Sequence, residues 1–152
     1  MSQSTALYET DFHAWAQRQA ALLRQGNYEQ LDAQHLLEEI EDMAGSQRRA
    51  LASRLQVLIS YLLKWEHQPE LRSRSWMATI RVQRAEIADL LVDNPSLRPQ
   101  LAMFVERAWP KAREFAWAET GLPLAAFPVE CSYAVEQILD PSFPVGISEQ
   151  AS

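Results

Sequence analysis

The chain has 152 residues, of which 47% are apolar, and its 20 acidic and 14 basic residues give it a net charge of −6. This length and composition predict one folded domain with a full core and exclude a disordered chain. The acidic charge disfavours nucleic-acid binding, because phosphate repels a negative body. The longest uncharged apolar run covers residues 57–63, whereas a membrane-spanning helix needs about 20 residues.

The first half of the chain predicts a loose start followed by two helices. Residues 1–9 lack periodicity and are expected to form a flexible tail. Asp11 can cap a first helix that Gly26 ends. Asp32 can cap a second, much longer helix that continues to residue 67, where a Gln-Pro pair stops it.

The second half predicts two further long helices and a short one. Ser75 is expected to cap the third helix, which stops before Pro95. Ser96 is expected to cap the fourth helix, and the glycine at 121 closes it. A short last helix is predicted over residues 132–139, followed by an Asp-Pro pair that ends it.

Together these elements predict an all-α fold, an up-and-down helical bundle of about four main helices plus a short C-terminal helix. The expected domain covers residues 10–143, with flexible tails over residues 1–9 and 144–152. In the second helix, the apolar residues of 57–63 point in nearly every direction, which is typical of a helix at the centre of a core. The first half of this helix has one apolar side and is expected at the edge of the core.

The acidic start of the second helix is the first candidate site for a ligand or a metal. Helical spacing places His35 beside Glu38 and Glu39, and places Asp42 beside both, with Glu41 in the same turn. Imidazole and carboxylates can hold a divalent metal, and close carboxylates can raise one another's pKa for acid-base chemistry. Alternatively, these acids are solvated and complement the helix dipole. No matching Glu-x-x-His motif occurs, so no cofactor is predicted.

Charge is sorted along the chain, which identifies a second candidate site. Residues 45–84 carry a net charge of +6, and the segments 1–44 and 85–152 each carry −6. Arginine and tryptophan in residues 64–84 can grip phosphates and stack bases. In the alternative interpretation, the tryptophans anchor the core and the arginines pair with acids on the first and fourth predicted helices. The candidate contacts to an anion or a partner are Arg72, Arg74, Trp76, Arg81, Gln83 and Arg84.

Four polar residues fall on helix faces that are otherwise apolar. Gln47 and Arg54 lie on the apolar stripe of the second helix, and Gln83 and Arg84 lie between apolar positions of the third. If these residues face one another, they form an internal polar layer that is either a small ligand site or a network that fixes helix register. Alternatively, they sit at the edge of the stripe with exposed tips.

The single cysteine, Cys131, excludes an internal disulfide and fits a reducing cytosol. No basic stretch followed by an apolar run opens the chain, so a signal peptide is not expected. These two features predict a cytoplasmic protein.

Several segments have a recognisable pattern. They are residues 8–16, the acidic 37–43, the centre 63–76 with 83–84 and 93–97, and the tail segments 119–122, 127–128 and 136–140. Over residues 8–143 they resemble the bacterial family catalogued as domain of unknown function 29. The family often has Cys-Pro-Tyr-Thr where this chain has Cys131-Ser132-Tyr133-Ala134. The resemblance implies a helical fold and brings no established activity, cofactor or catalytic residue.

The function is unknown, and three hypotheses follow from the sequence. The first is a small cytoplasmic helical interaction or regulatory module, with a protein partner or as a homodimer, because tryptophan and arginine are enriched at interfaces. The second is a metal-binding or ligand-binding protein or an enzyme, using the acidic motif and the Gln/Arg layer. The third is nucleic-acid binding through residues 64–84. No membrane partner is expected.

Overall fold

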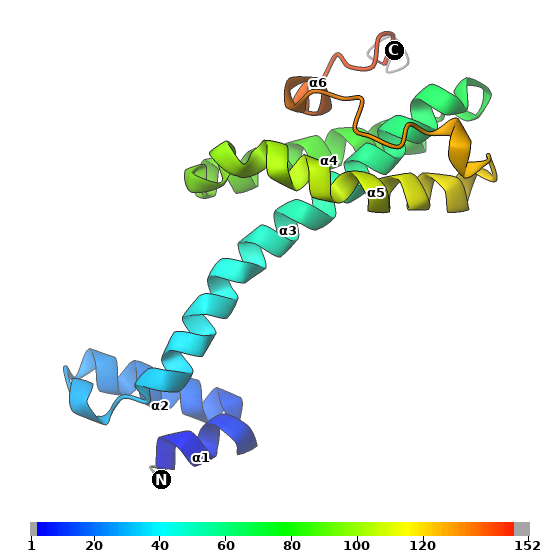
Figure 1. Cartoon of the computed structure of the whole chain (residues 1–152). Coiled ribbons are helices and arrows are strands. Elements are labelled where there is room, and N and C mark those ends of the chain that lie inside the picture. Colours follow the sequence, from blue (N-terminus) through cyan, green and yellow to red (C-terminus); the bar gives the residue numbers. More distant parts are fainter. Residues whose placement is uncertain (1–2, 148–152) are drawn as a thin grey trace. The chain divides into compact units, whose positions relative to one another are not determined.

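A computed structural model of the chain describes residues 3–147 (Figure 1), and this part contains α-helices, short 3₁₀ turns and irregular segments but no β-strand. The prediction of an all-α helical bundle is confirmed. The helices are α1 (Gln3–Thr10), α2 (Phe12–Arg24), α3 (Ala33–His67), α4 (Arg74–Asp93), α5 (Leu101–Thr120) and α6 (Val135–Leu139). No helix in the described part has the length and apolar character needed to cross a membrane.

The chain divides into two compact units, Met1–Ser46 and Gln47–Ser152. The helix α3 contributes its first half to the first unit and its second half to the second. The single domain predicted over residues 10–143 therefore covers parts of both units.

The first unit begins with a helix where the sequence predicts a flexible tail. Gln3–Thr10 form α1, which packs against α2. The ring of Tyr8 lies 5.7 Å from that of Phe12 and 4.9 Å from that of Trp15, measured between centroids. The helix α1 has no apolar period of its own, so we attribute its helical structure to aromatic packing against α2. Residues 1–2 of the predicted tail lie outside the described part.

The predicted caps of the first two long helices are confirmed. An Asp11 carboxylate oxygen accepts a hydrogen bond from the Ala14 amide at 3.0 Å, which caps α2. Asp32 accepts one from the His35 amide at 3.5 Å at the start of α3. Gly26 follows α2 with a φ of 72°, a conformation that glycine adopts without strain.

Three later helix starts differ from the prediction. The cap of α4 is Ser73 and not Ser75, since the Ser73 hydroxyl accepts from the Trp76 amide at 3.1 Å. Pro95–Gln100 form a 3₁₀ turn, and α5 begins only at Leu101. A second proline within that turn lacks an amide donor and disfavours α geometry in the residue before it. The last helix starts at residue 135 and not at 132.

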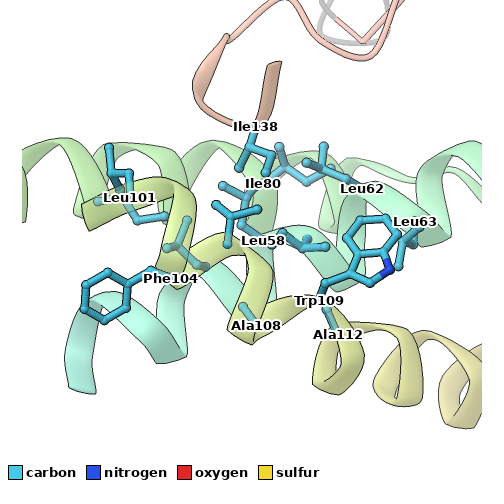
Figure 2. Packing of buried hydrophobic residues seen from close by; sticks show 14 of the residues in the cluster. Leu58, Leu62, Leu63, Ile80, Leu101, Phe104, Ala108, Trp109, Ala112 and Ile138 are labelled. Atoms are coloured by element: carbon cyan, nitrogen blue, oxygen red, sulfur yellow. The ribbon is translucent and has the colours of Figure 1, made fainter. Parts of the chain in front are cut away.

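The core of the second unit surrounds the second half of α3 (Figure 2). Leu58 and Leu62 of α3 are fully buried, and they face Ile80 of α4 and Ile138 of α6. This confirms that the part of α3 that is apolar on all sides is central. Burying one such side chain contributes about 1.5–3 kcal/mol to the free energy of unfolding.

The C-terminal segment also differs from the predicted tail. Ile147 is 2% exposed and belongs to the core of the second unit. The remaining residues of that predicted tail, 148–152, lie outside the described part.

Candidate functional site

A tyrosine from α1 contacts the acidic start of α3. The Tyr8 hydroxyl donates a hydrogen bond to Glu39 Oε1 at 2.6 Å. Its ring stacks on the His35 imidazole, with centroids 3.9 Å apart and planes 17° from parallel. The bond to Glu39, with burial and neighbouring carboxylates, raises the pKa of Tyr8 to about 12. Two residues of the predicted acidic cluster thus hold α1 against α3.

Asp32 connects α3 to α2 within the same unit. Its Oδ2 accepts a hydrogen bond from Trp15 Nε1 at 3.1 Å and lies 2.7 Å from His35 Nδ1. The Asp32 amide donates to Gln19 Oε1 at 2.8 Å. Burial raises the pKa of Asp32, but the hydrogen bonds from His35 and Trp15 outweigh it, so that the net pKa lies below its usual value. The carboxylate therefore stays ionised at neutral pH.

The charges of Glu38 and Asp42 contribute to the raised pKa of Tyr8. Glu38 and Glu41 lie at exposed positions, as does Asp42. Within residues 3–147, no three His, Cys, Asp or Glu side chains are placed to hold a metal ion together. The proposal of a metal or ligand site on these residues stays a prediction.

The apolar side of the same half of α3 is exposed to solvent. Leu37 is 55% exposed, Ile40 is 60% exposed and Met43 is 68% exposed. Large apolar side chains that gather on one exposed helix face mark an interaction site more often than isolated ones do. We call Leu37, Ile40 and Met43 the α3 stripe.

In the predicted basic site, Arg84 points into the protein. It is 7% exposed, and its Nε donates to the Ile138 carbonyl at 2.8 Å. Its Nη2 donates to the Phe143 carbonyl at 2.6 Å. Burial lowers the pKa of Arg84 to about 10, and the charge of Asp140 opposes this shift. Arg84 thus fixes the C-terminal segment against α4 and is not available to an external anion.

The tryptophan of the basic site is a packing residue. Lys64 Nζ lies 4.7 Å from the Trp76 ring centroid and 4.1 Å from that of Tyr61. The same ammonium group pairs with Glu119 Oε2 of α5 at 2.6 Å. This contact joins the end of α3 to α4 and α5, as the interpretation of tryptophans as anchors expects. Arg74 and Arg81 lie at exposed positions.

The four residues of the predicted polar layer do not form one layer. Arg54 Nη1 donates to Gln83 Oε1 at 3.3 Å, so these two do face each other. Gln47 instead accepts from the Asn94 side chain at 3.2 Å, and Arg84 reaches the C-terminal segment. Side-chain length explains the difference, because an arginine reaches past its own helix face to distant carbonyls.

Arg72 has a different environment from the other basic residues. It lines a groove of about 530 Å³ together with Glu66, Tyr133 and Gln137. Sequence reasoning did not single out the last three as a group, because Tyr133 and Gln137 lie 67 and 71 positions after Glu66 and no local spacing connects them to it.

These elements define a small all-α protein with a buried helical core. The family model of the Domain of unknown function DUF29 matches residues 7–144. The chain belongs to this family, which confirms the resemblance found in the sequence. Neither a curated protein nor a solved structure matches the chain.

Proposed function

We propose that this chain is a cytoplasmic protein-interaction module whose α3 stripe binds an amphipathic helix with basic flanks on a partner protein. The observation that carries the proposal is the exposure of Leu37, Ile40 and Met43, which ranges from 55% to 68%. The free thiol of Cys131 supports a reducing compartment such as the cytoplasm.

The stripe has the geometry of a helix-binding face. At about 100° per residue, its three side chains fall within a sector of about 120° around α3. An amphipathic helix with apolar residues three and four positions apart can cover such a sector along its length. Covering it removes three large side chains from water, each contributing about 1.5–3 kcal/mol if fully buried.

Charge supports a basic partner rather than an acidic one. Glu38 and Glu41 follow the stripe on the side of Leu37, and residues 1–44 carry a net charge of −6. Opposite charge on the partner fixes orientation and speeds association. In a self-pairing centred on Ile40, with two antiparallel copies of α3, the acids of both copies would face each other and repel. An antiparallel pairing with a second copy of the chain is therefore disfavoured at this surface.

The experiment is a calorimetric titration of the purified chain with two synthetic helical peptides. Both peptides have the same leucine spacing, and one has lysine flanks where the other has glutamate. We expect the lysine peptide to bind and the glutamate peptide to bind about tenfold or more weakly. Ile40→Ser should weaken the lysine peptide by a similar factor, since a central apolar contact is lost.

The matched control is Val82→Ser, which changes an apolar residue of α4 that is 54% exposed. It should leave binding of the lysine peptide unchanged. Equal binding of both peptides, or binding that Ile40→Ser does not weaken, would contradict the proposal. Light scattering adds a further outcome: a dimer that Ile40→Ser converts to a monomer would identify a second copy as the occupant and overturn the basic partner.

A further inference from the structure

The groove of about 530 Å³ in the second unit presents two opposite charges that do not pair with each other. Glu66 and Arg72 both line it. In the described part of the chain, these two residues do not form an ion pair within 4.0 Å, even though they are only six positions apart in the sequence. Opposite charges that share a groove without contact leave room for a ligand that carries both charges.

The guanidinium group of Arg72 is held in place from one side. Its Nε donates to the Trp65 carbonyl at 2.7 Å, and its central carbon lies 5.0 Å from the Trp65 ring centroid. These two contacts restrain the guanidinium group and leave its two terminal nitrogens for other partners. A planar fork of two N–H donors matches a carboxylate, which it binds with two parallel hydrogen bonds.

Tyr133 lies beside the carboxylate of Glu66. Burial raises the pKa of Tyr133, and the neighbouring Glu66 adds to this shift. The phenol therefore remains neutral. Its ring makes edge contacts with Trp109 and Phe143, both with centroids 5.4 Å apart. Glu66 itself is exposed, so that its carboxylate can accept from an ammonium group.

The remainder of the groove supplies one amide donor and an apolar wall. Gln137 Oε1 accepts from the Ala134 amide at 2.9 Å, which orients its Nε2 donor away from that bond. Phe143, Pro144 and Val145 line the groove, and Val145 is 93% exposed. An apolar side chain of a ligand would bury part of this wall.

We infer that this groove binds a small zwitterion, an amino acid or dipeptide with an apolar side chain, with its carboxylate on Arg72 and its ammonium on Glu66. The apolar side chain lies against Phe143, Pro144 and Val145. This site is independent of the α3 stripe, since its residues all belong to the second unit.

The test is NMR titration of the full chain with four probes of matched apolar group. They are L-leucine, the dipeptide leucyl-leucine, 4-methylpentanoate with only the carboxylate, and 3-methylbutylamine with only the ammonium. Leucine or leucyl-leucine should shift the Tyr133 and Val145 signals at concentrations up to about 10 mM. Each singly charged analogue should bind about tenfold or more weakly, because it lacks one charge-assisted contact.

Two variants and two matched controls assign the contacts. Glu66→Gln keeps the size and shape of this exposed side chain, so the fold is retained while the charge is lost. Arg72→Lys keeps the charge and removes the fork. Each should weaken the zwitterion about tenfold, whereas Glu70→Gln and Arg74→Lys, at exposed positions outside the groove, should not.

Three results would overturn the inference. The first is the absence of any shift of groove signals with both zwitterions at about 10 mM. The second is equal binding of the zwitterions and the singly charged analogues. The third is unchanged zwitterion binding in both variants. A preference for leucyl-leucine over leucine would assign the site to a dipeptide, and the reverse would assign it to an amino acid.

Discussion

Replacing Arg84 by methionine should detach the C-terminal segment from α4. The guanidinium group makes close hydrogen bonds to the carbonyls of Ile138 and Phe143, at 2.8 and 2.6 Å, and a longer one to that of Gln137, at 3.4 Å. Methionine fills much of the same volume but donates no hydrogen bond. Arg84→Met therefore leaves those carbonyls without their donor, and Ile138 itself is fully buried.

The magnitude follows from two opposing contributions. Each bond from a charged donor contributes about 1.5–3 kcal/mol, and burying a carbonyl without a donor costs a similar amount. Removing the charge also removes the cost of burying a guanidinium group that has no carboxylate bonded to it. Arg84 Nη1 is buried without a partner in the described part, which adds to that cost. The difference is a loss of about 2–4 kcal/mol in the free energy of unfolding of the second unit.

The assay is urea unfolding combined with hydrogen exchange measured by mass spectrometry over residues 135–147. We expect Arg84→Met to lower the urea midpoint and to speed exchange in this segment before the rest of the unit opens. Arg81→Met removes an exposed arginine one turn earlier on α4 and should stay within about 0.5 kcal/mol of the native protein. If Arg84→Met matches Arg81→Met in both measurements, the hydrogen bonds from Arg84 to the C-terminal segment do not stabilise the second unit, which would refute the prediction.

Three further predictions concern the first unit and the core. The pKa of Asp32 in the folded protein lies below its ordinary value of 3.8. Its ionised form therefore stabilises the fold above pH 3.8, and this contribution is lost as the pH falls through the folded-state pKa. Asp32→Asn should make stability depend less on pH below about pH 4. Tyr8, with a pKa of about 12, stabilises fully below its ordinary value of 10 and loses this effect as the pH rises toward 12. Glu39→Gln should lower that pKa toward 10, which tyrosinate absorbance measures against the matching Tyr8→Phe protein. Leu58→Ala should cost about 2–5 kcal/mol in urea unfolding, whereas Ile40→Ala should cost less than about 0.5 kcal/mol; equal losses would mean that the stripe is part of a core.

Local rules predicted the features that depend on neighbouring residues. Asp11 and Asp32 cap helices because a short acidic side chain reaches an amide three positions later, and both bonds are present. The left-handed glycine at 121 likewise ends α5 as predicted. The same rules placed the cap of α4 at Ser75, which lies inside the first turn of the helix, whereas Ser73 precedes the helix and caps it.

Contacts between distant positions could not be predicted in the same way. Tyr8 and Glu39 are 31 positions apart, and Arg84 lies 54 positions before the Ile138 carbonyl that it binds. Every residue has a backbone carbonyl, so the sequence cannot indicate which carbonyl Arg84 binds. The helix α1 was missed for a related reason, since its order depends on the rings of α2 and not on an apolar period of its own.

The basic residues of the segment 45–84 have different roles in the fold. Some of them hold structural elements together, and one is a candidate for ligand binding. Lys64 and Arg54 reach acids of later helices, at 2.6 Å from Glu119 and 3.7 Å from Glu86. The contact of Lys64 reaches the predicted fourth helix, where the arginines were expected to pair, whereas Arg54 pairs with an acid of the predicted third helix. Arg84 differs from both, because its hydrogen bonds go to backbone carbonyls.

Arg72 belongs to none of these groups. Its Nε is committed to a carbonyl and its central carbon lies over an indole ring, while the side chain lines a groove. Ordering a long side chain costs about 1.5–2 kcal/mol of conformational entropy. In this protein, the contacts with Trp65 already order the Arg72 side chain, and its two terminal nitrogens are not used in those contacts. A preorganised fork of this kind lowers the cost of binding a carboxylate, because less freedom remains to be lost when the ligand arrives.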